Sequence, residues 1–330
     1  MLVSVLLLTV GRHISAPPSV LVLVLVASPV WTLLVAGAAA VAVLRRPQDL
    51  RGWGLLSLQL GLWLAIWGRA WWASPTAEEG DTVRVLSWNV QRLGFEDADQ
   101  GPRLDCVVAA AKAVQPDLLA LMEVSARDVQ RLSTRLGLDC EHIDYRGTGR
   151  EDRGGVAACA RSPEWKLGRS GSRRFVDDGD WYFIFAEMVR RDEHQVLNLV
   201  SLHLQPNRLS LSGPRSPGAV AETHHAEADA LLARMATLQD PTVVAGDFNS
   251  TRETRLHGAL RVHLVDAYEQ AGWGPGRTAV AAGLVPLRVD YIYATPDIKP
   301  ASAANPAVDC SDHRPVVADL VLPEPWDRGR

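Results

Sequence analysis

One stretch of this sequence carries the clearest structural signal: Val243-Val244-Ala245-Gly246-Asp247-Phe248-Asn249. Its apolar residues predict a buried strand that stops at Gly246. An acid and an amide follow two residues apart, so they face the same way if the chain stays extended. Asp247 can polarise a water or hold a metal ion, and Asn249 can hydrogen-bond a developing oxyanion. An ordinary Asp-Asn turn explains the pattern equally well, so the stretch alone leaves both interpretations open.

The same pattern recurs elsewhere in residues 81–330, where short apolar segments adjoin polar residues that can bind a metal ion or a phosphate. These further residues are Asn89, Glu123, His203, Asp290, Asp312 and His313. Loops at strand ends carry the chemistry of many sheet proteins. Taken alone, each residue is more often an ordinary cap, turn or core residue. Their repeated position at strand ends is what indicates one shared site.

The residue types suggest separate roles within such a site. Mg²⁺ takes few protein ligands, typically a carboxylate plus waters and substrate oxygens, and Glu123 can be that carboxylate with Asn89 as a neutral neighbour. Asp312 and His313 are adjacent and offer a metal ligand or orienting group beside a base or phosphate donor. Asp290 is suited to fix the tautomer of a histidine.

Residues 81–330 are expected to form one α/β domain built around sheets. Hydrophobic patterning predicts strands at 83–89, 118–122, 155–160, 181–189, 196–203, 242–245, 289–293 and 315–322. Helical periodicity predicts helices over 104–114 and 219–238, the second preceded by a Pro/Ser/Gly-rich loop at 206–217. His224 and His225 are expected on the solvated face of that second helix. Many strands with intervening helices indicate a layered domain.

The N-terminal quarter has the composition of a membrane segment. Residues 19–44 contain no charged side chain and are dominated by Val, Leu and Ala. Crossing the hydrocarbon core takes about 20 apolar residues, so this run is long enough, with tilt or a bend at Pro29 absorbing the excess. Residues 53–72 form a second candidate span, flanked by Trp and interrupted by Arg69 near its end. The apolar run 1–10 is too short to cross alone and is expected to form only a partial span.

The loop between the two candidate spans fixes the expected topology. It carries Arg45, Arg46 and Arg51, and the positive-inside rule places it in the cytoplasm. The chain then emerges on the outer side, where residues 73–80 form a short polar linker. We therefore expect a multi-pass cell-membrane protein with an extracytoplasmic C-terminal domain. A buried helical hairpin inside a soluble protein is the alternative.

An extracytoplasmic domain permits disulfides among its cysteines, which are Cys106, Cys140, Cys159 and Cys310. Four cysteines allow three full pairings, and the sequence does not choose between them. Two bridges, one bridge and four buried thiols all remain open. No pair has Cys-x-x-Cys spacing, so structural zinc is not expected. Cys310 is expected to be a packed small residue rather than a nucleophile.

The charge balance argues against a strongly basic nucleic-acid-binding domain. The chain has 34 Lys and Arg against 38 Asp and Glu, a net charge of −4. Basic residues outnumber acidic ones in residues 1–80, so residues 81–330 are more acidic than the whole chain. A nuclease needs basic loops along the phosphate backbone. The candidates are Arg173-Arg174, Arg190-Arg191 and Arg208/Arg215, for which solvated surface is the expected role.

Several motifs occur in a fixed order: Trp88-Asn89, Glu123, Gly155-Val156-Ala157, His203-Leu204, Gly246-Asp247-Phe248-Asn249, Asp290-Tyr291 and Ser311-Asp312-His313. As an ordered set they resemble the endonuclease/exonuclease/phosphatase superfamily over essentially all of residues 81–330. The resemblance implies a four-layer α/β/β/α sandwich of the DNase I-like type. It also implies metal-dependent hydrolysis of phosphate esters, with Mg²⁺ as the cofactor and Mn²⁺ as a second possibility.

By position, the resemblance divides the site residues into two groups. The metal-binding group is Asn89, Glu123 and Asp312. The catalytic group is His203, Asp247, Asn249, Asp290 and His313.

The resemblance also implies a role for each residue. In the metal-binding group, Glu123 is the principal ligand, with the other two close by. In the catalytic group, Asp247 orients or activates the attacking water and Asn249 binds the scissile phosphate. The two histidines donate to phosphate oxygens or handle protons, and Asp290 orients His313. Which group is the general base stays open.

The membrane segment narrows the resemblance further. A multi-span N-terminus joined to an external domain of this kind is similar to the VanJ-like glycopeptide-resistance proteins, which are membrane phosphatases acting on lipid-linked pyrophosphate. This implies a phosphorylated lipid substrate, polyprenyl pyrophosphate, and the lipid bilayer as partner, while protein partners are unknown. An extracellular nuclease or a phospholipid phosphodiesterase are rival activities of the same site. A membrane binding or sensor module that has lost catalysis is the rival of another class.

Overall fold

The computed structural model describes residues 80–94, 101–145, 154–175, 182–191, 195–206, 217–281 and 285–324, with Gly37, Val41, Arg45, Trp53, Gly54 and Ser57. The chain divides into two compact units, residues 1–73 with 208–222 and residues 74–207 with 223–330. The candidate spans 1–10, 19–44 and 53–72 and most of the linker 73–80 lie outside the described residues, apart from the single residues named above. No described helix combines the length and apolarity that a bilayer crossing needs.

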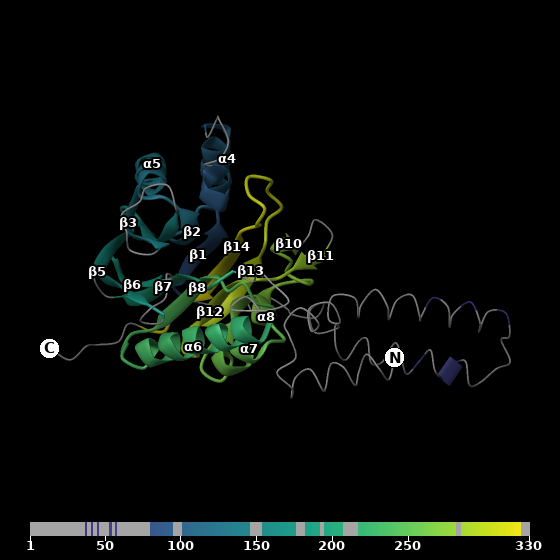
Figure 1. Ribbon diagram of the computed structural model, residues 1–330. Coiled ribbons are helices and arrows are strands. Elements are labelled where there is room, and N and C mark those ends of the chain that lie inside the picture. Colours follow the sequence, from purple (N-terminus) through teal and green to yellow (C-terminus); the bar gives the residue numbers. More distant parts are fainter. Residues whose placement is uncertain are drawn as a thin grey trace. The chain divides into compact units, whose positions relative to one another are not determined.

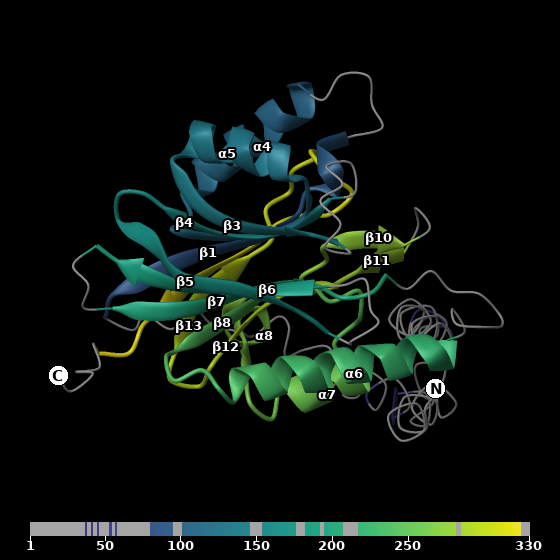
Figure 2. The ribbon, with the colours of Figure 1, turned by 60° about the vertical axis from the view of Figure 1, so that its left-hand side comes forward.

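Two mixed sheets lie face to face in the second unit (Figures 1 and 2). The strands of the first sheet are β1 (Thr82–Asn89), β2 (Leu118–Val124), β3 (Leu138–Asp144), β4 (Gly155–Arg161), β13 (Lys299–Ala304) and β14 (Val316–Val321). The strands of the second are β5 (Trp165–Arg174), β6 (Tyr182–Arg190), β7 (Val196–His203), β8 (Thr242–Asp247), β9 (Val265–Asp266) and β12 (Asp290–Ala294). Their spatial orders are β13-β14-β1-β2-β4-β3 and β5-β6-β7-β8-β12-β9. A separate hairpin joins β10 (Ala279–Ala281) to β11 (Val285–Leu287).

Helices cover the outer face of each sheet. On the first sheet these are α4 (Gly101–Val114) and α5 (Ala126–Leu136), and on the second α6 (Pro217–Met235) and α7 (Arg255–Leu260), as Figure 2 shows. The 3-10 helix η2 (Gln91–Gly94) follows β1, and α8 (Ala267–Ala271) packs against β12 and β13. The α/β/β/α sandwich expected from the sequence is therefore confirmed.

The central strands are apolar on both faces because each face meets another layer. On β1, Val83 and Val85 face the layer between the sheets, whereas Leu86 and Trp88 pack under α4. Successive side chains on a strand point to opposite faces. A strand covered on both sides therefore has a continuous hydrophobic sequence, which is why the central strands could be recognised.

The topology brings distant strand ends to one edge. β1 and β2 are parallel and connected through α4, and β7 and β8 are parallel and connected through α6. His203 therefore lies opposite Asp247, at the carboxyl ends of β7 and β8. β12 runs antiparallel to β8, so its first residue, Asp290, also lies opposite Asp247. Asn89 ends β1 opposite Met122, next to Glu123.

The elements that the sequence analysis did not identify are mainly polar or short. β3 and β5 are edge strands whose residues are mostly half-buried or exposed. An edge strand is paired on one side only and stays partly exposed to solvent, so its hydrophobic pattern is weak. The helix α5 was also missed, although Ser125 caps it by accepting a hydrogen bond from the backbone of Asp128.

All four cysteines form disulfides, Cys106 with Cys310 and Cys140 with Cys159. The sequence had left the pairing open. The first bridge ties α4 to the loop that precedes β14, and the second joins the adjacent strands β3 and β4.

Candidate active site

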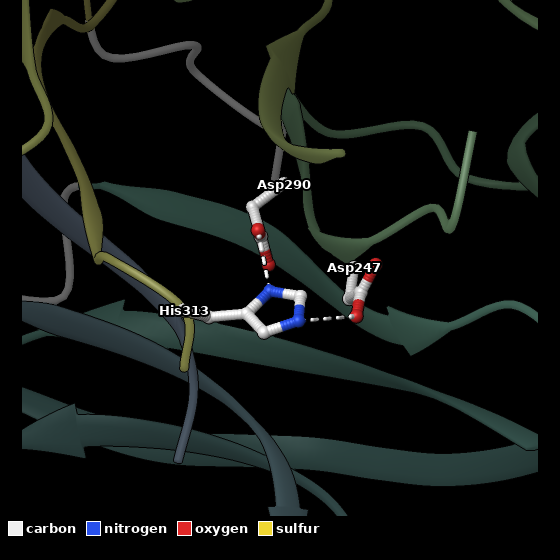
Figure 3. Close-up of side chains that lie close together, drawn as sticks. All are labelled: Asp247, Asp290 and His313. Atoms are coloured by element: carbon white, nitrogen blue, oxygen red, sulfur yellow. Dashed lines mark hydrogen bonds and ion pairs between the residues drawn. The ribbon is translucent and has the colours of Figure 1, made fainter. Parts of the chain in front are cut away.

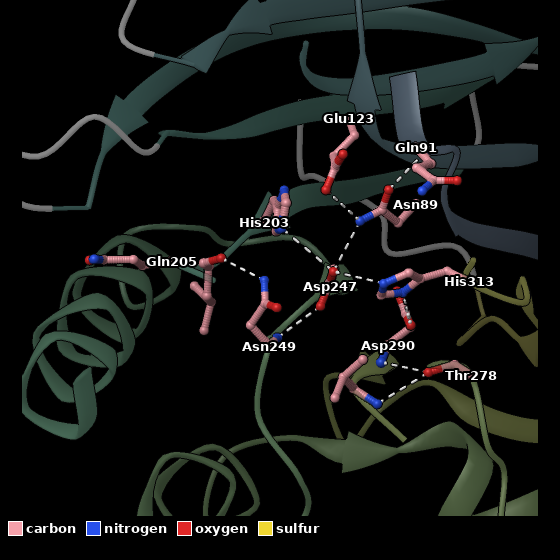
Figure 4. A network of polar contacts seen from close by, with 12 residues as sticks. Asn89, Gln91, Glu123, His203, Gln205, Asp247, Asn249, Thr278, Asp290 and His313 are labelled. Atoms are coloured by element: carbon pink, nitrogen blue, oxygen red, sulfur yellow. Dashed lines mark hydrogen bonds and ion pairs between the residues drawn. The ribbon is translucent and has the colours of Figure 1, made fainter. Parts of the chain in front are cut away.

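Asp247 is the centre of a buried polar cluster (Figure 4). It is 1% exposed at the end of β8. Its Oδ2 accepts a hydrogen bond from Asn89 Nδ2 at 3.1 Å, and the Nε2 atoms of His203 and His313 lie 3.5 and 3.8 Å from the same oxygen. Its Oδ1 accepts the backbone N–H of Asn249 at 2.8 Å. One carboxylate thus meets groups from both sheets.

Asn89 links this carboxylate to a second one. Its Nδ2 also donates to Glu123 Oε1 at 3.2 Å, while its Oδ1 accepts the backbone N–H of Gln91 at 3.0 Å. The amide therefore presents N–H groups, and not its oxygen, to both carboxylates. The sequence placed Asn89 among the metal-binding residues; here it bridges Glu123 and Asp247.

Glu123 owes its position to an irregularity in β2. The pairing of β2 with β4 shifts between Met122 and Val124, and Glu123 has φ 52°. A bulge re-aims the extra residue, and positive φ is uncommon outside glycine. The backbone N–H of Glu123 donates to the hydroxyl of Tyr145 at 3.0 Å, which fixes this conformation. The half-buried carboxylate can therefore meet a ligand from solvent.

Asp290 contacts the ring of His313 (Figure 3), the histidine that the sequence analysis expected it to orient. The His313 Nδ1 and Asp290 Oδ2 atoms are 2.8 Å apart, and Asp290 is fully buried. The Thr278 hydroxyl oxygen accepts the backbone N–H groups of Val289 and Asp290 at 3.1 and 3.2 Å, which holds the start of β12 in place.

Burial and charge set the protonation of this pair. Burial alone lowers the pKa of His313, but Asp290 and then Asp247 outweigh it and raise that pKa to about 10. Burial and then the charge of Asp290 raise the pKa of Asp247 above its ordinary value. The arrangement therefore places a protonated imidazole beside a carboxylate that is a stronger base than an exposed aspartate.

Tyr145 is a site residue that the sequence analysis missed. Its hydroxyl lies 2.5 Å from His203 Nδ1 and accepts the N–H of Glu123. Tyr145 directly follows β3, the polar edge strand that had no clear pattern. The only signal was an aromatic residue after the acidic end of that segment, Asp144-Tyr145.

The two remaining candidates lie in different settings. Asn249 has φ 46°, and its Nδ2 donates to the carbonyl of Leu204 at 2.9 Å, so it lies against the end of β7. Asp312 is exposed, and its Oδ1 lies 3.3 Å from Ser311 Oγ. Among the described hydrogen bonds, none joins Asp312 to the Asn89 and Glu123 pair. The structure thus brings the expected site residues together, with the exposed Asp312 beside His313, whose pKa its charge helps to raise.

The residues fit a hard divalent cation. Glu123 offers half-buried carboxylate oxygen, the donor type that Mg²⁺ prefers, with room for waters. A second group of potential ligand atoms, one each from Asp247, Asp290 and His313, lies within 4.8 Å of one another. The cluster therefore offers two candidate positions for a cation, Glu123 at the solvent side and the largely buried triplet of Asp247, Asp290 and His313.

One expectation about α6 is wrong. His224 was placed on a solvated face but is buried, and its Nε2 lies 2.8 Å from the carbonyl of Gln205. The buried Glu227 accepts the N–H of the same Gln205 at 3.1 Å. Both His224 and Glu227 lie on the buried face of α6, which packs against the second sheet. The two side chains hold the backbone just beyond His203.

Comparisons with known proteins agree with this fold. The profile of the Endonuclease/Exonuclease/phosphatase family matches residues 86–313. None of the curated proteins matches significantly. A solved endonuclease/exonuclease/phosphatase from Bacteroides vulgatus has 20% identity and a TM-score of 0.63, covering 73% of this chain and 99% of its own.

Two further solved structures have similar statistics. The catalytic domain of human Nocturnin with bound sulfate has 21% identity, a TM-score of 0.59, and coverage of 72% of this chain and 94% of its own. A mannosyl-6-phosphatase from Bacteroides thetaiotaomicron has 15% identity, a TM-score of 0.60, and coverage of 73% and 100%. Likeness at these identities shows the fold alone.

Proposed function

This chain belongs to the endonuclease/exonuclease/phosphatase family, and we propose that it is a membrane-anchored, Mg²⁺-dependent phosphohydrolase acting on a lipid-linked pyrophosphate, a polyprenyl pyrophosphate, at the outer membrane face. Members of the family are phosphoester hydrolases, which supports hydrolase activity here.

A single observation carries the proposal. The amide of Asn89 joins the carboxylates of Glu123 and Asp247, with the His313–Asp290 pair beside them. Burying two acids and a charged imidazole together is costly in free energy. A module that had lost catalysis would gain nothing that offsets this cost. The intact cluster therefore favours an enzyme over an inactive binding or sensor module.

Glu123 would hold the metal ion, which would supply positive charge to stabilise the phosphate oxygens. The protein's own groups provide the rest. Protonated His313 donates a hydrogen bond to a phosphate oxygen, and its Nδ1 stays fixed by Asp290. Asp247, whose pKa is raised, accepts the proton of the attacking water. The N–H of Asn249 keeps the Asp247 carboxylate in position.

The sequence supports the membrane anchor in this proposal, and the disulfides support the location on the outer side. Residues 19–44 carry no charge, and residues 53–72 are nearly as apolar. Two disulfides pair all four cysteines, which fits an oxidising compartment. Anchoring by the linker 73–80 would raise the effective concentration of a headgroup substrate. Binding of a diphosphate headgroup does not require the protein to recognise nucleic-acid bases, in keeping with the acidic charge of residues 81–330.

The test is a parallel assay of the purified full-length chain in detergent. Polyprenyl diphosphate, a phospholipid and DNA are each offered with Mg²⁺, with Mn²⁺ and with EDTA. We expect release of phosphate from the diphosphate in Mg²⁺ and none in EDTA. Full activity in EDTA would refute the metal dependence, and preferential cleavage of phospholipid or DNA would reassign the substrate to one of the rival activities.

A further inference from the structure

The loop between β13 and β14 carries Ser311, Asp312 and His313 but has little regular structure. No helix or strand is formed between Val308 and Asp312. His313 forms an isolated antiparallel bridge with Ala279, in which the N–H of Arg314 donates to the carbonyl of Thr278 at 2.7 Å. The place of the His313 imidazole therefore depends on a few individual tethers.

Most of these tethers are single hydrogen bonds. The Ser311 hydroxyl donates to the carbonyl of Asn89 at 2.8 Å and accepts the N–H of His313 at 3.2 Å. The indole Nε1 of Trp88 donates to the carbonyl of His313 at 2.9 Å. Each such bond adds little net stability, because water competes for the same groups.

One tether is covalent. Cys310, directly before Ser311, is bonded to Cys106 of α4. Cys310 is 3% exposed and packs in the apolar cluster under α4 with Val107 and Trp88. Cys106 is an exposed residue of that helix.

The second disulfide has no comparable connection to the site. Cys140 and Cys159 are directly opposite each other on β3 and β4, which are already joined along their length by the sheet ladder. Cys159 is fully buried. This bridge adds to an existing pairing and provides an internal control.

We propose that the Cys106–Cys310 disulfide is a positioning bond that holds His313 in its catalytic place, so that opening the bond lowers turnover. The inference rests on the proposed function. Opening by a dithiol transfers two electrons and two protons to the S–S bond. Cys106 and Cys310 become thiols, and the dithiol closes to its own disulfide. Because misplacing a catalytic group by about 1 Å can cost on the order of 10²-fold, a partly released loop should lower kcat by about tenfold or more.

The experiment compares two double variants of the full-length protein, Cys106→Ala/Cys310→Ala and Cys140→Ala/Cys159→Ala. Alanine is chosen because serine would bury a hydroxyl at positions 310 and 159. We expect the first variant to lose about tenfold or more in kcat with little change in KM, and the second to keep wild-type kcat. Dithiothreitol should lower the kcat of the second variant reversibly, with recovery on reoxidation, and leave the first unchanged. Equal losses in both variants, or inhibition of the first variant by dithiothreitol, would overturn the proposal.

Hydrogen exchange of the backbone N–H groups of His313 and Arg314, which are both hydrogen-bonded, separates this inference from the proposed function, because it needs no substrate. Exchange should rise in Cys106→Ala/Cys310→Ala and stay at the wild-type level in Cys140→Ala/Cys159→Ala. Unchanged exchange in the first variant would overturn the positioning role even in an active enzyme. A wild-type protein that turns over no substrate while showing the expected exchange would instead refute only the proposed function.

Discussion

Asn89 couples two halves of the site that come from different sheets. Its amide lies on β1 of the first sheet and donates to Glu123 on β2 and to Asp247 on β8 of the second. Both acceptors are carboxylates, so their charges would repel each other without the intervening N–H groups. The cation proposed at Glu123 and the proton acceptance proposed for Asp247 would thereby be electrostatically connected.

At the residue scale, Glu123→Gln is the direct test of the metal assignment. The variant keeps an oxygen acceptor for Asn89 but loses the negative charge, so cation binding should weaken. We expect kcat/KM at fixed Mg²⁺ to fall by about 10²-fold or more, since a metal's charge stabilisation is worth several kcal/mol. Thermal unfolding in EDTA should be close to that of the wild type. A rate within a few-fold of wild type at all Mg²⁺ concentrations would place the cation elsewhere.

Glu227 gives a pH-dependent prediction. Burial raises its pKa from 4.5 to about 8. Below pH 4.5 the carboxyl is protonated in both states; above it the unfolded chain releases the proton first, so stability falls as pH rises until about 8. Glu227→Gln removes this loss. Its free energy of unfolding should exceed the wild-type value by an amount that grows from pH 5 to 8, by up to about 1.4 kcal/mol per pH unit.

Urea unfolding of both proteins across that pH range measures the difference. A difference that does not change with pH would show that Glu227 ionises normally.

At the element scale, β12 is fixed at both ends by threonine hydroxyls, only one of which is near the site. Thr278 Oγ accepts the N–H groups of Val289 and Asp290, and Thr295 Oγ accepts the N–H of Thr242 at 3.0 Å. Thr278→Val and Thr295→Val each remove an acceptor from partly or fully buried backbone, at a cost of about 1–3 kcal/mol.

The two valine variants should therefore differ in catalysis rather than only in stability. Thr278→Val should lower kcat by about tenfold, because Asp290 no longer holds His313 correctly. Thr295→Val should keep kcat while unfolding at lower temperature. Steady-state kinetics and thermal melts of both variants test this, and an equal effect on kcat would show that the start of β12 does not position the acid.

At the scale of the whole molecule, the membrane proposal makes its own prediction. The full chain should remain in the pellet after carbonate extraction, because apolar spans resist high pH whereas surface-bound proteins are released. A reporter fused after Arg330 should be active only when it is outside the cytoplasm. Release by carbonate would show that the chain is not anchored in the membrane. Activity of the reporter in the cytoplasm would show that the topology is the reverse of the proposed one.

The sequence by itself determined the layered fold and named most of the polar residues that the structure brings together. Val243–Asn249 and the other apolar strands were recognisable because burial on both faces leaves a continuous hydrophobic pattern. The polar residues that close those strands could be named because strand ends share one edge of a sheet. The match of the family profile confirms the family.

The tertiary structure alone decided the contacts that no local pattern encodes. The contacts of Tyr145 with His203, of Gln205 with His224 and of Cys106 with Cys310 are not indicated by the pattern of any one segment. The orientation of the Asn89 amide likewise follows from its neighbours Gln91, Glu123 and Asp247. Backbone periodicity is a property of adjacent residues, whereas these contacts join residues far apart in the chain. They depend on sheet register and on how the layers pack.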